Sequence, residues 1–142
     1  MKNSHFLFFT ILILFCACKA EQSVTLCTSY PSIDFNGTMY VQPKGSPGFT
    51  NTFTWQQAVD YCSDLDFDGC DDWYLPGVEE LGALAEHRDE IGDFEKQPHL
   101  YWSSTHNPQE DDEAYGIQFL YGTSHYQSVW EIDYHRCRCV RR

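Results

Sequence analysis

The sequence predicts an α+β fold in which two helices precede a C-terminal antiparallel sheet, with disulfides joining the two parts. Apolar residues recur every three or four positions after Thr54 and again after Pro76, and they alternate with polar residues from Leu100 onwards. Five cysteines follow the N-terminal leader. The chain behind that leader is long enough for one domain with its own core and too short for two.

The leader reads as an export signal. Lys2 precedes an apolar run, residues 6–15, whose one polar residue is Thr10, as in secretory signal peptides. The run is too short to span a bilayer. Cleavage before Cys18 is favoured, because Ala17 is small and Cys18 would then be acylated as in a bacterial lipoprotein. Cleavage after Ala20 is the alternative, and it would release a soluble protein.

These features predict an exported protein in three segments. Residues 1–18 are the signal peptide, 19–37 a tether or irregular entry, and 38–142 the folded domain. Acyl chains on Cys18 would place the protein at the outer membrane or cell surface, with the lipid anchor as its only membrane contact. Without acylation the protein would be periplasmic or secreted.

The charge balance limits the partners. Acidic residues outnumber Lys and Arg by 21 to 9, which gives a net charge of −12. Such a chain is repelled by other polyanions. We therefore expect no nucleic acid, anionic lipid or polyanionic glycan as partner.

The elements follow in order along the chain. A strand is expected over 38–43. The first helix runs from Thr54, as N-cap, to about Leu65. A second begins at Pro76, which suits the first helical position, with Glu79 and Glu80 in its first turn. The polar segment 87–98 reads as a loop. Alternating runs then predict strands at 100–104, 114–121, 124–132 and 134–140, with a turn at 122–123.

Cysteines in an exported protein are expected to form disulfides. Alternation along the last strand places Cys137 and Cys139 on one face, pointing inward together. Cys62 and Cys70 are the natural partners for them. Cys27 is then either the odd thiol or a competitor, because the counts and spacings alone allow several pairings.

Five motifs carry a family resemblance. In order they are TWQQAVDYCSDL, GCDDWYLPGVEEL, YWSST, YGT and RCRCVRR. Together they resemble the C-terminal domain of the Legionella collagen-like adhesin and its bacterial relatives, over residues 54–142. The resemblance implies a C-type lectin-like fold: two helices on a small twisted sheet, with long loops that bind. It also implies a Cys62–Cys139 bridge and a core containing Trp73, Leu75, Leu81, Trp102 and Val140.

The resemblance implies less about the ligand. The adhesin is associated with sulfated glycans, which it binds through a basic, trimeric surface. The family thus allows a trimer here. Glycosaminoglycan affinity is not carried over, because this chain is strongly acidic and no collagen-like repeat precedes the domain.

An acidic stretch between the helices resembles a calcium loop. Asp64, Asp66, Asp68 and Asp72 fall at positions 1, 3, 5 and 9 of an EF-hand pattern. Position 12, where a bidentate Glu should complete the ligands, is Leu75. A metal-free connector is the favoured interpretation, and calcium is the alternative. No other cofactor is expected.

The loop at 106–113 and the aromatic residues near it are the candidate binding region. Its acidic side chains would face a hydroxyl-rich or cationic partner, and rings on neighbouring strands could form a stacking platform. Alternation places Tyr115 in step with buried positions, so only some rings can be exposed. The residues predicted to bind a cell-surface glycan or protein are Asn107, Glu110, Asp111, Asp112, Tyr115, Tyr126 and Trp130.

No catalytic constellation stands out. Ser103 and Ser104 lack elbow glycines, and the histidines do not have metal-ligand spacing. We therefore expect a non-enzymatic recognition module. A structural envelope protein without a small ligand is the main alternative. An enzyme related to the formylglycine-generating enzymes, which use paired cysteines as in Cys137-Arg138-Cys139, is a weaker one.

Overall fold

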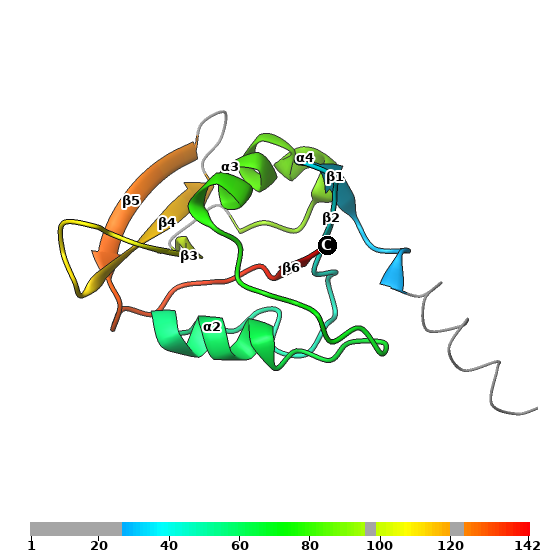
Figure 1. Cartoon of the computed structure of the whole chain (residues 1–142), viewed down its shortest axis with the longest axis horizontal. Coiled ribbons are helices and arrows are strands. Elements are labelled where there is room, and N and C mark those ends of the chain that lie inside the picture. Colours follow the sequence, from blue (N-terminus) through cyan, green and yellow to red (C-terminus); the bar gives the residue numbers. More distant parts are fainter. Residues whose placement is uncertain (1–26, 96–98, 120–123) are drawn as a thin grey trace, which may run out of the picture.

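The computed structural model describes residues 27–95, 99–119 and 124–142 (Figure 1). The expected α+β class is confirmed, with three helices and six strands in these ranges. The leader, including Cys18, and the turn predicted at 122–123 lie outside these ranges. The elements are β1 (Ser32–Asp34), β2 (Thr38–Val41), α2 (Trp55–Ser63), α3 (Val78–Glu86), α4 (Arg88–Ile91), β3 (Tyr101–His106), β4 (Glu113–Phe119), β5 (Ser124–Trp130) and β6 (Val140–Arg141).

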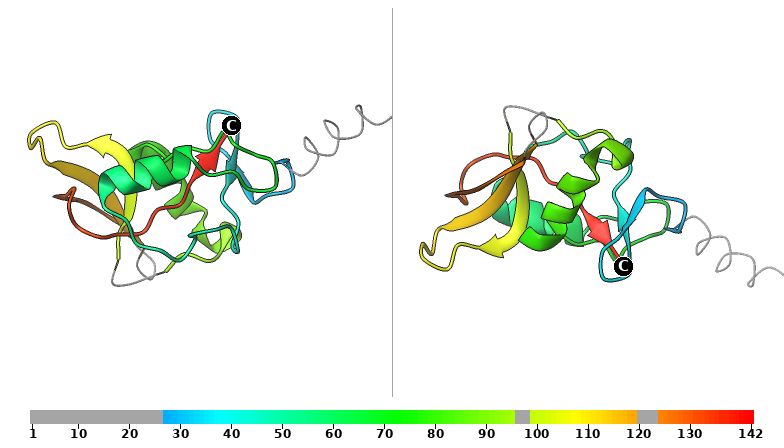
Figure 2. Two further views of the ribbon diagram at one scale, coloured as in Figure 1. Left: turned by 90° about the horizontal axis from the view of Figure 1, so that it is seen from below. Right: turned by 90° about the horizontal axis from the view of Figure 1, so that it is seen from above.

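The strands form two three-stranded antiparallel sheets, where the sequence suggested one. Their orders are β1-β2-β6 and β3-β4-β5. The sheets lie at opposite ends of the molecule, with α2 and α3 on either side of the chain that connects them (Figures 1 and 2). The last strand is shorter than the predicted 134–140. It joins β2 instead of β5, because residues 135–139 bond to several separate elements on the way.

Helix α2 begins where the sequence predicts. The Thr54 hydroxyl accepts a hydrogen bond from the Gln57 N–H at 3.5 Å, and the Gln57 side chain accepts one from the Thr54 N–H at 3.1 Å. This capping box satisfies two N–H groups that the helix itself leaves unpaired. The helix buries Ala58 and Cys62.

Helix α3 begins at Val78, two residues later than predicted. The Glu80 carboxylate accepts from the Gly77 N–H at 3.0 Å, and Thr105 of β3 accepts from the Val78 N–H at 3.0 Å. These bonds fix the start of the helix against the second sheet. The segment predicted as a loop over 87–98 contains the short helix α4.

The core has two parts. One surrounds the cysteines and includes Trp73, Leu75 and Trp102, whereas the other is mainly aliphatic and includes Leu81 and Val140. All five residues that the resemblance placed in the core are buried.

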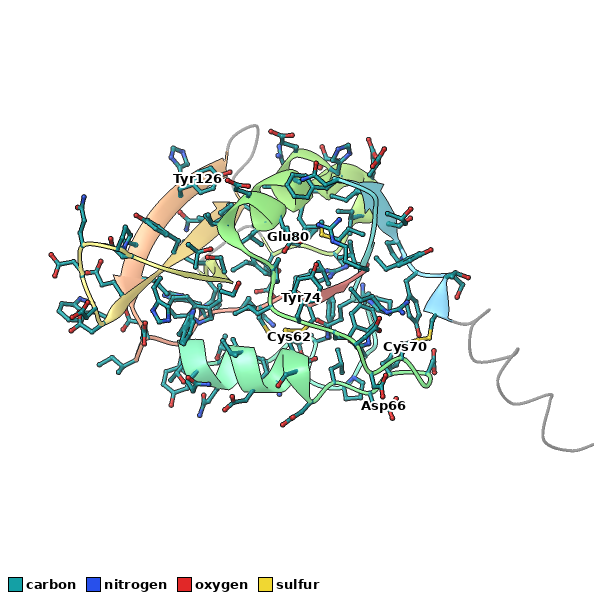
Figure 3. The ribbon with its side chains drawn as sticks, viewed as in Figure 1. Cys62, Asp66, Cys70, Tyr74, Glu80 and Tyr126 are labelled. Carbon is teal, nitrogen blue, oxygen red and sulfur yellow. A yellow bond between two sulfur atoms is a disulfide. The ribbon has the colours of Figure 1, made fainter. Side chains whose placement is uncertain are left out.

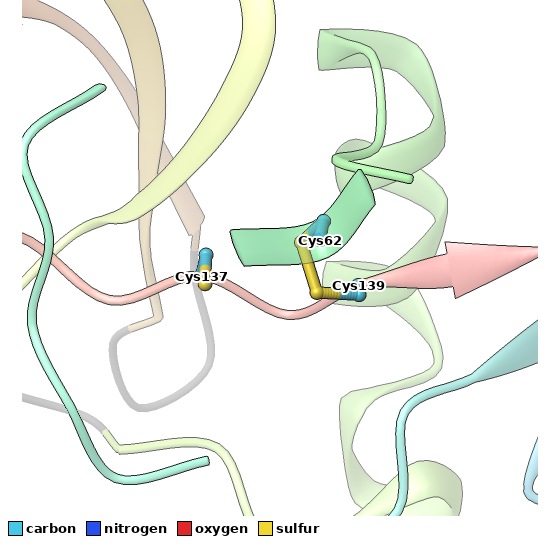
Figure 4. A group of neighbouring side chains, drawn as sticks. All are labelled: Cys62, Cys137 and Cys139. Carbon is cyan, nitrogen blue, oxygen red and sulfur yellow. A yellow bond between two sulfur atoms is a disulfide. The ribbon is translucent and has the colours of Figure 1, made fainter. Parts of the chain in front are cut away.

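Two disulfides cross-link the described chain. Cys62 bonds to Cys139, as the resemblance implied, with Cα atoms 5.4 Å apart. The pairing of Cys70 with Cys137 is wrong: Cys70 bonds to Cys27, and Cys137 is a free, buried thiol. Cys137 does face inward near Cys139, and its sulfur lies within 4.8 Å of both sulfurs of the Cys62–Cys139 disulfide (Figure 4).

Part of the segment predicted as a tether or irregular entry has regular structure. Within residues 19–37, the described part contains β1 and Cys27, which is bridged to Cys70. Among the described residues, no helix has the length and apolar character to cross a membrane.

Candidate ligand-binding surface

The second sheet presents one face that α3 covers only in part. Residues directly opposite each other on antiparallel strands share a face. Glu113 lies opposite Trp130, and Tyr115 lies opposite Ser128. Further along β4, Ile117 is fully buried in the core that α3 supplies. The end of the face that carries Tyr115 and Trp130 is left open.

Tyr126 marks the boundary between the covered and open parts of this face. It lies opposite buried Ile117, yet 58% of its surface is exposed. Its hydroxyl lies so close over Gly82 of α3 that a Cβ atom at position 82 would clash with it. Figure 3 shows Tyr126 on β5 next to this helix. The glycine thus lets the tyrosine ring lie close to α3.

A polar group occupies the open end. The Asn107 amide donates to Ser128 Oγ at 3.0 Å and to Glu113 Oε2 at 3.2 Å, and Ser128 Oγ donates to the same carboxylate oxygen at 2.5 Å. The Asn107 backbone N–H also donates to the Glu113 carbonyl at 2.8 Å. These bonds hold a carboxylate, an amide and a hydroxyl in fixed positions beside Trp130, which is 53% exposed.

The acidic loop predicted over 106–113 borders this surface. Glu110, Asp111 and Asp112 are exposed in the turn between β3 and β4. The Asp112 carbonyl accepts from the Glu131 N–H at 2.9 Å, which ties the turn to the end of β5. Of the seven predicted residues, the structure brings four to the sheet face, namely Asn107, Tyr115, Tyr126 and Trp130.

Sequence reasoning missed Glu113 and Ser128. Ser128 lies on a predicted strand in step with the aromatic residues, whereas Glu113 was assigned to the acidic loop although β4 begins with it. The missing information was which residues lie opposite each other across the hairpin, because that register places Ser128 against Tyr115 and Glu113 against Trp130.

The stretch that resembles an EF-hand forms a tight hairpin. Phe67 and Cys70 exchange both backbone hydrogen bonds at 3.1 Å, around Asp68 and Gly69 with φ of 54° and 78°. Asp-Gly is the pair that a two-residue turn of this kind favours. Asp66 and Cys70 lie at the end of the molecule away from Tyr126 (Figure 3).

The carboxylates of this stretch do not converge. Asp72 is paired with the Arg141 guanidinium. Among the described residues, the one group of three or more metal-ligating side chains with donor atoms within 4.8 Å consists of Cys62, Cys137 and Cys139. Calcium binding by the four aspartates Asp64, Asp66, Asp68 and Asp72 therefore stays a prediction without support from this geometry.

An open pocket of about 420 Å³ adjoins the same hairpin. Arg141 and Arg142 line it together with the Cys27–Cys70 disulfide. Arg141 binds Asp72, and its guanidinium lowers the pKa of that carboxyl. Arg142 binds Glu80 at 2.7 Å. Because carboxylates already neutralise both guanidinium groups, the pocket offers little attraction to an anion.

The free thiol has a different environment. Cys137 is 4% exposed, and burial raises its pKa to about 12. The reactive form of a cysteine is the thiolate. At neutral pH this side chain is therefore a protonated thiol and a poor nucleophile, which does not support a role as one of a reactive cysteine pair.

Comparison with known proteins gives a family. No curated protein matches the chain. The sequence profile of the Lcl C-terminal domain family matches residues 20–141, which is most of the chain. This agrees with the ordered motifs around Cys62, Trp73, Trp102 and Cys139. The chain belongs to the Lcl C-terminal domain family.

Proposed function

We propose that this protein is a non-enzymatic recognition module of the bacterial cell surface, and that it binds an uncharged or amine-bearing glycan. The observation that carries the proposal is the pair of exposed rings, Tyr126 and Trp130, on the same face as the hydrogen-bonded group of Asn107, Glu113 and Ser128. We call these five residues the aromatic face.

The chemistry of the aromatic face suits sugars. Flat rings with a polar edge pack against the apolar face of a sugar ring while they remain partly wet. The carboxylate, amide and hydroxyl beside them can accept and donate hydrogen bonds to sugar hydroxyls. Because the net charge is −12 and Glu113 lies on the face, a neutral or cationic glycan fits better than a sulfated one.

The family and the cysteines support the location. The Lcl C-terminal domain family suggests an adhesin-like surface module. Two disulfides suit an oxidising compartment outside the cytoplasm. Anchoring through an acylated Cys18 and a C-type lectin-like fold belong to the same proposal. Two helices beside small antiparallel sheets, with a Cys62–Cys139 bridge, support that fold.

A glycan array probed with the wild type, Trp130→Ala and Ile132→Ala tests the proposal. Ile132 is the matched control, because it is also apolar and exposed, at 78%, but follows β5 in a turn. We expect Trp130→Ala to weaken binding by about ten-fold, which corresponds to the upper end of an aromatic contact. Ile132→Ala should bind as the wild type does.

Other results would overturn parts of the proposal. Equal binding by Trp130→Ala and wild type would remove the aromatic face from the site. An empty array with a protein recovered by pull-down would favour a protein ligand, and turnover in a hydrolase screen would favour an enzyme. Intact mass spectrometry of membrane-extracted protein would test the anchor, since an acylated N-terminus at Cys18 adds a defined mass.

A further inference from the structure

The two edges of the second sheet differ in how their backbone is satisfied. At the β3 edge, Trp102 N–H donates to the Arg136 carbonyl at 2.8 Å and Ser104 N–H donates to the Pro76 carbonyl at 2.8 Å. Other segments therefore cover β3. Strand β5 is the opposite edge, and Figure 1 shows it on the outside of the sheet.

The register shows which β5 groups point away from the sheet. The Glu131 N–H donates to the Asp112 carbonyl, and these two residues continue the β4–β5 pairing. Bonded and non-bonded pairs alternate along an antiparallel ladder. The N–H and C=O groups of Ser124, Tyr126 and Ser128 therefore point outward. Among the described residues, no backbone bond reaches them.

Strand β5 also lacks the features that protect exposed edges. Natural edge strands are interrupted by proline, charged side chains or bulges, which prevent another strand from adding to them. Ser124–Trp130 contains no proline and no Asp, Glu, Lys or Arg. Its pairing with β4 runs through seven consecutive pairs without a shift. The strand is thus a regular, uncharged edge on a chain whose net charge is −12.

We propose that β5 is a dimer interface, in which a second copy of this chain adds its own β5 antiparallel to the first. The register that uses the whole strand places Gln127 on the two-fold axis and pairs Tyr126 with Ser128 of the partner subunit. Both are outward-bonding residues, so each such pair can exchange two backbone hydrogen bonds.

A second copy fits this edge better than an unrelated basic segment does. Because β5 has no acidic side chains, a cationic segment would find no opposite charge to pair with. For the same reason, two acidic copies would not bring like charges together at the seam, the line along which their β5 strands meet. Tyr126 and Trp130 flank the seam, so pairing would bury part of their exposed surface.

Pairing would also extend the aromatic face. Residues opposite each other across the seam share a face. Tyr126 and Trp130 of both copies would therefore lie on one side of a continuous six-stranded sheet. The dimer itself does not depend on any ligand, so it is tested without one.

Sedimentation of the purified protein from low micromolar to submillimolar concentration tests the interface. The wild type should shift from monomer to dimer. Ser128→Pro removes an outward N–H and places a ring in the seam, and we expect it to remain monomeric. Ser128→Ala is the control, because it also loses the Ser128 hydroxyl but keeps the backbone N–H. It should dimerise as the wild type does.

A charge pair tests the register without a proline. Gln127 is exposed and lies on the proposed two-fold axis, where paired side chains come closest. Gln127→Glu and Gln127→Lys each place like charges together, and each should raise the dimer Kd up to about five-fold. An equimolar mixture of the two variants should recover tight pairing as a heterodimer, and the recovery should weaken with salt.

Several outcomes would overturn the inference. These are a wild type that stays monomeric over the whole range, one that forms trimers, and a dimer that Ser128→Pro leaves intact. If Ser128→Pro unfolds, the Gln127 variants decide. Failure of the mixture to pair better than either variant alone would then rule out the proposed two-fold arrangement.

Discussion

The two sheets of this molecule are held together in different ways. Strands β1, β2 and β6 have three, four and two residues, whereas β3, β4 and β5 have six, seven and seven. Both disulfides lie at the short-stranded sheet, because Cys27 precedes β1 and Cys139 precedes β6. The longer sheet contains no cysteine. The disulfides thus stabilise the sheet whose strands are too short to be stable on their own. The longer-stranded sheet has no cross-link, and one of its faces and one of its edges are exposed.

Removing the longer cross-link should have the largest effect on stability. Cys139→Ser opens a bridge between residues 77 apart, which contributes about 4 to 5 kcal/mol in the chain-entropy model. Cys137 can replace the lost partner, since its sulfur lies within 4.8 Å of that of Cys62. We therefore expect the double variant Cys137→Ser/Cys139→Ser to lose more unfolding free energy than Cys139→Ser.

Denaturant unfolding of both variants, with thiol counting by mass spectrometry, measures this effect. Hydrogen exchange should show β1, β2 and β6 losing protection before β4 and β5. The idea of a substitute bridge fails if Cys139→Ser retains two free thiols and is as unstable as the double variant.

A second, smaller effect appears at alkaline pH. Burial raises the pKa of Cys137 from 9.0 to about 12, so the folded state holds this proton more tightly than the unfolded state does. The resulting stability is complete below pH 9 and is lost as the pH rises towards 12. The slope reaches about 1.4 kcal/mol per pH unit.

The Cys137→Ser variant isolates this thiol. Burial also raises the pKa of Tyr61 and Tyr101, so the wild type loses stability at high pH for more than one reason. The difference between wild type and variant should shrink steadily between pH 9 and 12. A constant difference over that interval would mean that the thiol does not titrate as a buried group.

The smallest predicted effect concerns the pair of Arg141 and Asp72. Asp72→Asn removes a carboxylate whose pKa is lowered by its hydrogen bond to the Arg141 guanidinium. Because the Asp72 side chain is half exposed, we expect a loss of at most about 1 kcal/mol. A lowered pKa gives stability that is present at neutral pH and disappears in acid. The gap between wild type and Asp72→Asn should therefore close as the pH falls below about 4, in thermal melts at low salt. A gap that persists in acid would assign the loss to packing.

Local patterns predicted the parts that depend on nearby residues. Thr54 as N-cap placed the start of α2 correctly, and alternation placed β4 closely and β5 with two residues too many at its end. The aromatic residues of the candidate site followed from the same alternation. The Cys62–Cys139 bridge required the family resemblance, because alternation left several pairings open.

The remaining features depend on contacts between distant residues. Cys70 pairs with Cys27 because a hairpin carries it towards the N-terminal strands, and no spacing encodes that approach. Residues 140–141 pair with the shorter-stranded sheet and not with the longer-stranded one. Their partners include Tyr40 and Tyr74, which are far away in the sequence. Glu113 and Ser128 join the site through hairpin register alone.

The arrangement of the two disulfides has a mechanical consequence. A pull on the chain ahead of Cys27 and behind Cys139 finds a covalent route from Cys27 to Cys70, back along residues 62–70, and from Cys62 to Cys139. Residues 28–61 and 71–138 lie outside this route. Tension along the chain would therefore pass through residues 62–70 and bypass β1 to β5, and β6, which follows Cys139, is the one strand that would bear it directly.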